Sequence, residues 1–149
     1  MRELMIFLHL TGVVVWVGGM FFAHHCLRPA ALQLPPPQRL PLMAAALGRF
    51  FGFVTGALLL LWASGLAMML QSGFGGAPVA WHAMMGVALV MTAIFAVIRL
   101  LRYPRLRAGV AAGDWPAAGA ALNGIRILVV VNLGLGWLTI AIATLGRLL

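Results

Sequence analysis

Four long apolar segments alternate with short stretches that are rich in proline, glycine or arginine. The apolar segments cover about residues 4–27, 42–71, 79–101 and 118–145. A helix needs about 20 apolar residues to cross a hydrocarbon core roughly 30 Å thick, because each residue rises 1.5 Å. Each segment reaches this length, so the pattern predicts four membrane-spanning helices in one transmembrane domain, residues 1–149.

Helix-breaking residues mark the limits of these segments. Pro29 and the three prolines at 35–37 follow the first segment, and the Ser-Gly-Phe-Gly-Gly stretch at 72–76 follows the second. Pro104 predicts the end of the third helix. Asp114-Trp115-Pro116 predicts the start of the fourth, since proline is tolerated in a first helical turn. Short links between consecutive spans favour an all-α, antiparallel four-helix bundle in the membrane.

The composition excludes most soluble and hydrolytic functions. The chain is 64% hydrophobic and 8% charged, whereas about a quarter of the residues in a soluble domain are charged. Its two acidic residues, Glu3 and Asp114, are too few for paired-carboxylate hydrolysis, magnesium-dependent phosphoryl transfer or a carboxylate calcium site. The single cysteine, Cys26, excludes an internal disulfide and any cysteine-rich zinc or iron-sulfur site.

The net charge of +8 comes from arginines between the apolar segments. This distribution indicates membrane topology rather than nucleic-acid binding. The first and third connections carry basic residues and the second has none; the basic residues in or next to them are Arg28, Arg39, Arg49, Arg99, Arg102, Arg105, Arg107 and Arg126. By the positive-inside rule, these two connections face the cytoplasm and both termini face the periplasm of a bacterial inner membrane. The first apolar run exceeds the 7–15 residues of a signal-peptide core, so we expect the N-terminus to be retained.

Two histidines lie inside predicted spans, where an ionisable residue is costly without a partner or a cavity. His9 and His82 sit a few residues inside the same side of the membrane, so their depths differ by only a few ångströms. We predict that they face each other and ligate one haem b. Gly12 and Trp16 lie near the face of His9, and Gly86 follows His82 by one turn, giving gaps and an aromatic wall for a porphyrin. Alternatively, the glycines allow close helix packing and the histidines bond to neighbouring groups.

His24 shares a helical face with His9 but lies 15 residues later, or about 22 Å deeper. It therefore cannot ligate the same iron. His25 points about 100° away from it, and no further histidine remains on that side to pair with it. We interpret the pair as a hydrated interfacial feature beside anionic headgroups, the alternative being a proton or substrate contact. A chain of two haems across the bilayer is not expected.

Three arginines close to or inside the spans are candidates for binding carboxylates, because a guanidinium holds a carboxylate in two-point contact. Arg49, Arg99 and Arg126 could clamp porphyrin propionates. The alternative is that they extend to the phosphates of the inner leaflet.

Small residues at every fourth position of the second span predict close helix packing, and a homodimer is a further expectation. These are Gly48, Gly52 and Gly56. A polar stripe on the fourth span predicts interhelical hydrogen bonds. It comprises Asn132, Gly136 and Thr139.

Methionines cluster near the outer ends of the spans, at the level of His9 and His82. They are Met5, Met68, Met69, Met84 and Met85. Thioether and imidazole ligands suit copper(I), although methionine is also ordinary apolar filling. Copper is therefore the alternative to haem.

The first helix carries a family resemblance. Leu8-His9 followed by Trp16-Val17-Gly18-Gly19 resembles the first helix shared by CopD-type copper-resistance membrane domains and HemJ-type protoporphyrinogen oxidases. The resemblance extends weakly over most of the chain, at Arg49, Gly65, Trp81-His82 and Asn123.

The two families imply different functions. The HemJ-type resemblance implies about four spans, a bound haem b and oxidation of protoporphyrinogen, with His9 and His82 matching the important histidines. The chain departs from that family at Met84, where a lysine is usual, and at Gly124-Ile125, where Glu-Pro is usual. The helix-4 run from Arg126 to Gly146 is more similar to CopD-type domains, whose name implies copper movement.

We therefore expect a membrane redox protein that passes electrons between a porphyrin, a quinone or an oxidant and a partner. If it is an enzyme, protoporphyrinogen oxidation is the first reaction to test. The alternatives are a copper-binding or copper-transport protein with histidine and methionine ligands, and a structural subunit. The bilayer is the expected surrounding, and no nucleic-acid partner is expected.

Overall fold

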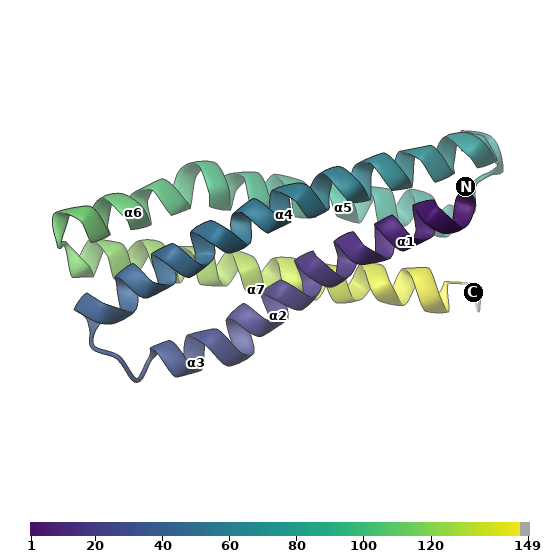
Figure 1. Cartoon of the computed structure of the whole chain (residues 1–149). Helices are drawn as coiled ribbons and strands as arrows, with labels where there is room; N and C mark the ends of the chain where they lie inside the picture. Colours follow the sequence, from purple (N-terminus) through teal and green to yellow (C-terminus); the bar gives the residue numbers. More distant parts are fainter. Residues whose placement is uncertain (147–149) are drawn as a thin grey trace.

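A computed structural model describes residues 1–146. In this range all regular structure is helical, and the four rods run antiparallel to one another (Figure 1). Each rod is long and apolar enough to cross a membrane; they cover Arg2–Ala31, Pro36–Ser72, Val79–Ala112 and Trp115–Leu145. The protein is thus a multi-pass membrane protein of four helices, as the hydropathy pattern predicts.

The first rod is a continuous series of α-helical and π-helical turns. Its parts are α1 (Arg2–Val13), a π-helical turn (Val14–Gly18), α2 (Gly19–Phe22), a second π-helical turn (Ala23–Leu27) and α3 (Arg28–Ala31). The rod therefore continues through Pro29, which we expected to end it. A proline ring clashes with the carbonyl four residues earlier, and that carbonyl belongs to His25, inside the second π-helical turn. The wider turn explains how the helix accommodates the proline.

The third rod passes Pro104 in the same way. It consists of α5 (Val79–Val97), a π-helical turn (Ile98–Arg102) and α6 (Tyr103–Ala112). The carbonyl that Pro104 would meet belongs to Leu100, again inside a π-helical turn. The helix ends instead at Gly113, whose φ of +67° is the left-handed conformation typical of a glycine after a helix.

The second and fourth rods are single helices, α4 (Pro36–Ser72) and α7 (Trp115–Leu145). Helix α4 begins before the predicted residue 42. Pro36 and Pro37 lie in its first turn, where the N–H groups have no helical partner, and the helix continues through Pro41, which lies inside it. Helix α7 starts as predicted: the Asp114 carboxylate accepts a hydrogen bond of 3.0 Å from the Ala117 N–H. A 3₁₀ turn, Phe74–Gly76, leads from α4 towards α5.

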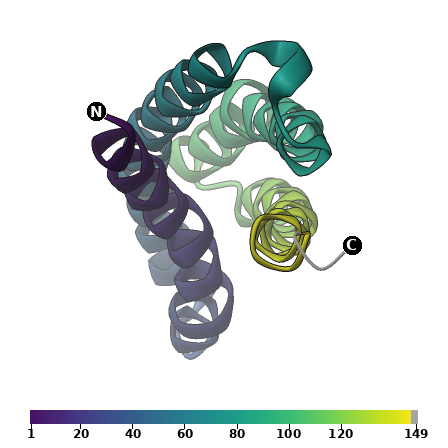
Figure 2. The same cartoon turned by 90° about the vertical axis from the view of Figure 1, so that its right-hand side faces the viewer.

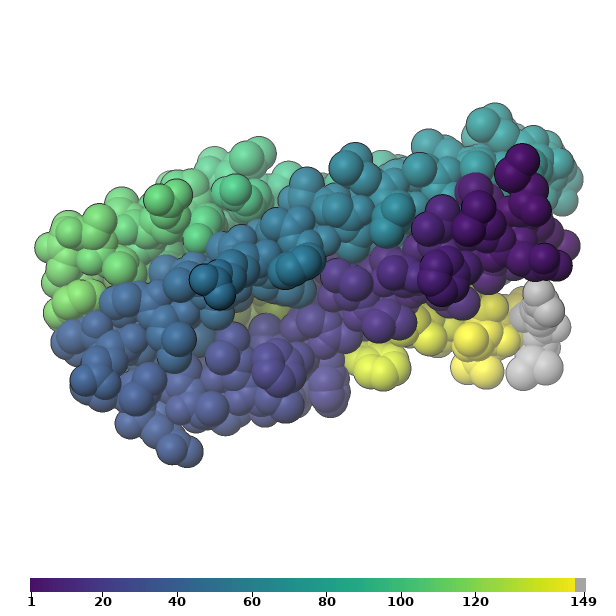
Figure 3. Space-filling view, viewed as in Figure 1, coloured from purple at the N-terminus to yellow at the C-terminus, as the bar shows by residue number. Residues whose placement is uncertain are grey.

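The start of α1 and the end of α7 lie at one end of the bundle, together with the α4–α5 connection (Figure 1). We call this the termini end. The α3–α4 and α6–α7 connections lie at the opposite end, which we call the arginine end because it carries most of the arginines. Helix α1 packs against α4, whereas α5 and α6 pack against α7. The end-on view shows these two pairs side by side (Figure 2), and the space-filling view shows α1 lying along α4 (Figure 3).

The tightest packing lies in the middle of the bundle and towards the arginine end. The Phe51 ring meets the rings of Phe95 and Tyr103 edge-on, with centroids 5.8 and 5.3 Å apart. The buried Tyr103 hydroxyl donates to the Ala44 carbonyl at 3.0 Å, and Gly48 leaves room for that hydroxyl. These aromatic contacts join α4 to the third rod. Towards the termini end, α4 and α5 make few contacts and cavities lie between the helices.

The predicted polar and small-residue stripes have separate outcomes. Asn132 donates from Nδ2 to the Met91 carbonyl at 3.2 Å, which confirms interhelical hydrogen bonding by α7. Gly48 contacts the third rod, but Gly52 and Gly56 are exposed and have open space where a Cβ would lie. Only the first glycine of that row is therefore used for packing within the bundle.

Candidate functional site

The candidate site is a cavity of about 240 Å³ at the termini end, between α1, α4, α5 and the end of α7. We call it the methionine cavity. Its lining includes five side chains with possible ligand atoms, which are His9, Met68, Met69, Met84 and Met85. The remaining lining is apolar or aromatic, and no charged residue contributes to it. A group bound here would thus meet neutral, soft ligands in a region of low dielectric.

A second cavity, of about 180 Å³, continues from the first towards the centre of the bundle. We call it the inner extension. It shares His9 with the methionine cavity and reaches Trp16, Met91 and Thr139. Trp16 lies seven residues after His9, so the extension runs about 10 Å along the helix. Trp16 is buried, and its ring meets Phe95 edge-on with centroids 6.3 Å apart, which closes the inner side.

His9 is held in a defined orientation by α4. Its Nδ1 lies 3.0 Å from the Oγ of Ser64, a fully buried residue. The Ser64 hydroxyl donates its one proton to the Leu60 carbonyl, so its oxygen accepts a hydrogen bond from His9. This arrangement favours the tautomer of His9 that is protonated on Nδ1, in which Nε2 keeps a free lone pair. A neutral imidazole fixed in this tautomer is the form that ligates a metal ion.

The methionines reach the cavity from two helices that form one side of it. Met68 and Met69 lie near the end of α4, while Met84 and Met85 lie near the start of α5. On α5, the residues at 81, 84, 85 and 88 line the cavity, and this spacing defines one helical face. Met5, which shares their level in the sequence, does not line the cavity.

His82 is on a different face of α5. It follows Trp81, which lines the cavity, and adjacent helical residues point about 100° apart. The His82 side chain is exposed, and its Nδ1 lies 3.3 Å from the Pro78 carbonyl of the preceding turn. His82 lines neither of the cavities that contain His9. The structure therefore does not bring these two histidines together, although they lie at the same end of the bundle.

The predicted glycine gaps are also used differently. A Cβ on Gly12 would lie 2.7 Å from Leu61 Cγ and 3.0 Å from the Ala57 carbonyl oxygen. Gly12 thus allows α1 to approach α4 closely, which was our alternative interpretation. Gly86 lines neither cavity and faces open space. Trp16, by contrast, lines the inner extension.

None of the three arginines predicted to bind propionates lines a cavity with His9, and Arg99 is exposed and lines none of the cavities described here. Arg49 is exposed and lines none of the cavities described here. Arg126 lines a third cavity at the arginine end, together with His24. His24 is about 22 Å along the helix from His9, at 1.5 Å per residue. Arg126 and His9 therefore cannot hold the same porphyrin.

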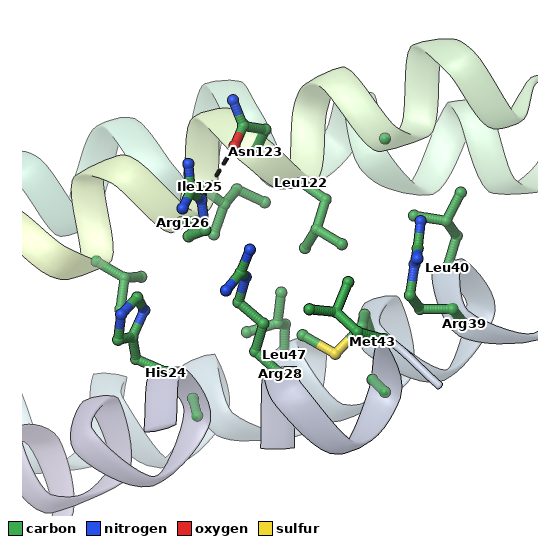
Figure 4. A pocket seen from close by; sticks show the side chains of 15 residues that line it. His24, Arg28, Arg39, Leu40, Met43, Leu47, Leu122, Asn123, Ile125 and Arg126 are labelled. Carbon is green, nitrogen blue, oxygen red and sulfur yellow. Dashed lines mark hydrogen bonds between the residues drawn. The ribbon is translucent and has the colours of Figure 1, made fainter. Parts of the chain in front are cut away.

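This third cavity, of about 210 Å³, was not predicted from the sequence. We call it the arginine cavity; its polar lining comprises His24, Arg28, Arg39, Asn123 and Arg126 (Figure 4). Arg28 and Arg126 are 98 residues apart in the chain, and their positions in the sequence indicate topology alone. Only the packing of α7 beside the first rod brings them to one cavity.

A site for a hard or borderline metal is absent from residues 1–146. No group of three or more histidine, cysteine, aspartate or glutamate side chains in this range could hold a metal ion. The imidazole of His9 and the surrounding thioethers are the ligand atoms that the methionine cavity offers. They suit a soft, monovalent metal ion better than zinc or magnesium.

Comparison with known proteins gives one family. The model of copper resistance protein D, CopD, matches residues 44–145, which contain nearly all of α4 and the whole of α5, α6 and α7. Neither the curated proteins nor the solved structures give a match. The matched segment carries Met68, Met69, Met84 and Met85, while His9 precedes it. Because this match covers more than half of the chain, the protein belongs to the copper resistance protein D family of membrane proteins.

Proposed function

We propose that this protein binds copper(I) in the methionine cavity, as the first step of moving the ion into or across the membrane. The observation that carries the proposal is the contact of 3.0 Å between His9 Nδ1 and Ser64 Oγ, which orients the ring and favours the tautomer with a free lone pair on Nε2. His9 lines a cavity that also contains four methionines. One imidazole with several thioethers is a ligand set that favours copper(I) over divalent ions.

The uncharged lining supports a monovalent cargo. A divalent ion costs more to transfer from water into a low-dielectric cavity than a monovalent ion does, and anionic ligands offset that cost. The methionine cavity has no carboxylate or thiolate in its lining. Copper(I) needs less compensation, and thioethers bind it without adding charge. The family match, through its name, supports a role that involves copper.

The inner extension offers the ion a path from His9 towards the centre of the bundle. It leads from His9 to the level of Trp16, and the Met91 side chain in its lining offers another thioether. We infer that copper(I) is bound first by His9 and the outer methionines and is then passed towards Met91. By the positive-inside rule, the arginine-rich opposite end supports an orientation with the termini end on the periplasmic side of a bacterial inner membrane. Copper would thus enter from the periplasm.

The geometry does not favour the haem b alternative. Two-histidine ligation requires His82 in the cavity of His9, and propionate binding requires an arginine close by. His82 lies outside that cavity and Arg126 lines a cavity at the other end of the bundle. Residues of α4 occupy the space beside Gly12, so it is not open for a porphyrin ring. For these reasons we place copper first, and with it a binding or transport function rather than protoporphyrinogen oxidation.

Copper(I) binding to the purified protein in detergent micelles tests this proposal. Under anaerobic, reducing conditions, a chromogenic copper(I) chelator competes with the protein, and its absorbance reports the bound fraction. We expect the His9→Ala variant, and the Met68→Leu, Met84→Leu double variant, to lose most of the binding. The control variants are His82→Ala and Met5→Leu, which alter the same residue types at the same end but outside the cavity.

The same preparation distinguishes the alternatives. Copper binding that survives in the His9→Ala variant, or that falls equally in the His82→Ala control, would contradict the proposed site. A strong Soret absorption band in the purified protein that is lost in both histidine variants would favour haem instead. We expect no such band.

A further inference from the structure

The arginine cavity is a site of a different kind, at the opposite end of the bundle. The first rod contributes His24 and Arg28, α4 contributes Arg39, and α7 contributes Asn123 and Arg126. Figure 4 shows the Arg28 side chain extending towards the helix that carries Arg126, with His24 beside them. Three separate rods thus place positively charged groups around one space of about 210 Å³.

These three arginines differ from the others in the part of the chain that the structure describes. Arg28, Arg39 and Arg126 are half-buried. Outside the cavity, the arginines among residues 1–146 are all exposed; they are Arg2, Arg49, Arg99, Arg102, Arg105 and Arg107. Partial burial raises the cost of bringing like charges together, because solvent screens them less. An anion bound in the cavity would offset this charge.

The chain itself provides no such anion. Its only carboxylate side chains are those of Glu3 and Asp114. Glu3 is in the first turn of α1 at the termini end, and Asp114 caps α7 through the Ala117 N–H. The polar partner of Arg126 is neutral: its Nε donates to Asn123 Oδ1 at 3.0 Å. That bond fixes the guanidinium while leaving its terminal N–H groups for another acceptor.

The rest of the lining indicates what the anion is attached to. The apolar lining beside the arginines includes Leu32, whose side chain is exposed, and the half-buried Leu122. A small hydrophilic anion would gain nothing from this lining, whereas an acyl chain would. Basic pockets between transmembrane helices are typical binding sites for anionic lipid headgroups.

We propose that the arginine cavity binds one anionic phospholipid. Arg28 and Arg126 hold its phosphate in charge-assisted hydrogen bonds, Arg39 adds positive charge, and an acyl chain covers Leu32 and Leu122. The bound lipid would link the first rod to α4 and α7 at the end of the bundle where the loops meet. This site is independent of copper and of the methionine cavity.

Native mass spectrometry of the full-length protein in detergent, titrated with phosphatidylglycerol, tests the proposal. We expect one lipid to bind well above the level of phosphatidylcholine with the same acyl chains. Each arginine beside an anionic headgroup contributes about a fivefold factor, so the Arg28→Gln, Arg126→Gln double variant should bind about 25-fold more weakly. The matched control is the Arg105→Gln, Arg107→Gln double variant, which removes the same charge from exposed positions; its binding should change by less than about threefold.

A second variant tests the acyl part without changing the charge. Gly119 lines the cavity, and nothing lies within 4 Å of the position of an added Cβ. Gly119→Leu would therefore fill the cavity while leaving the backbone undisturbed, and we expect it to weaken phosphatidylglycerol binding. It also serves as the test if the double arginine variant does not fold.

Three results would overturn the proposal. Equal losses in the two double-arginine variants would mean that the surface charge as a whole attracts lipid. Unchanged binding in Gly119→Leu would mean that no acyl chain enters the cavity. Displacement of the lipid by millimolar inorganic phosphate would assign the site to a free anion.

Discussion

The two ends of the bundle hold cavities of similar volume, about 240 and 210 Å³, but of opposite chemistry. The methionine cavity has no charged lining residue and offers an imidazole and thioethers. The arginine cavity is lined by three arginines and a histidine. We propose a soft cation for the first and an anionic headgroup for the second. Similar space in one bundle thus selects different ligands through the side chains that line it.

A closely packed aromatic layer separates the two cavities. Trp16, Phe95, Phe51 and Tyr103 form a chain of edge-on contacts across the bundle. The residues that line the arginine cavity include none that line the methionine cavity or its inner extension. The described structure is therefore closed in the middle, and passage of an ion would require this layer to move.

The largest effect is expected from removing the centre of that layer. Phe51 is 1% exposed, and Phe51→Ala should lower the free energy of unfolding by about 3–5 kcal/mol through lost contacts and the cavity left behind. Unfolding in mixed detergent micelles, followed by circular dichroism, measures the change. Phe53→Ala, at an exposed position two residues away, is the control and should have little effect. Similar losses in both variants would show that the aromatic layer does not stabilise the bundle.

Removing the hydrogen-bond partner of His9 should affect only the methionine cavity. In Ser64→Ala the ring keeps its metal-binding nitrogen but loses the group that fixes its orientation and tautomer. Partners of this kind contribute about 10–100-fold to metal affinity, so we expect a loss of copper(I) affinity in this range. The chelator competition measures it. Thr55→Ala is the control, since the Thr55 hydroxyl bonds within α4 to the Phe51 carbonyl and lies outside the cavity.

A smaller effect is expected where the aromatic layer meets the arginine end. Tyr103→Phe removes one buried hydrogen bond, to the Ala44 carbonyl, while keeping the ring contact with Phe51. Such a bond contributes about 0.5–1.5 kcal/mol to stability. Unfolding in mixed micelles should show a loss of this size, with copper(I) affinity unchanged. A change in copper affinity would mean that the two ends are coupled through the layer.

The fold was predictable because the hydropathy of each segment, taken alone, indicates whether that segment can span a membrane. Length and apolar content identified four spans. The short links predicted an antiparallel, all-helical bundle in which the start of α1 and the end of α7 lie on the same side. The limits at Pro29 and Pro104 were not predictable in the same way. A proline ordinarily ends a helix, and here a π-helical turn before each one lets the helix continue.

The depth of the candidate site along the bundle was predictable, but the rotation of the helices that line it was not. The level of His9, Met68 and Met84 follows from counting residues, and the structure places all three in one cavity. Whether His82 faces the cavity depends on the rotation of α5 about its axis. The sequence does not specify that rotation, because apolar residues occur on all sides of the helix. Ser64 gave a signal that we did not use: its hydroxyl lies eight residues from the end of α4, and His9 lies seven residues from the start of α1.

The smallest effect is expected from the acidic residue at the arginine end. Asp114→Asn keeps a side-chain oxygen that can cap α7, so stability should fall by less than about 0.5 kcal/mol. The substitution also removes a negative charge from an exposed position, where screening leaves little long-range effect. Phosphatidylglycerol affinity should therefore rise by less than about twofold, and copper(I) affinity should stay the same. A larger rise would mean that the net charge of this end determines lipid binding, rather than the convergence of Arg28 and Arg126. The contrast between the two cavities would then be only a gradient of surface charge along the bundle.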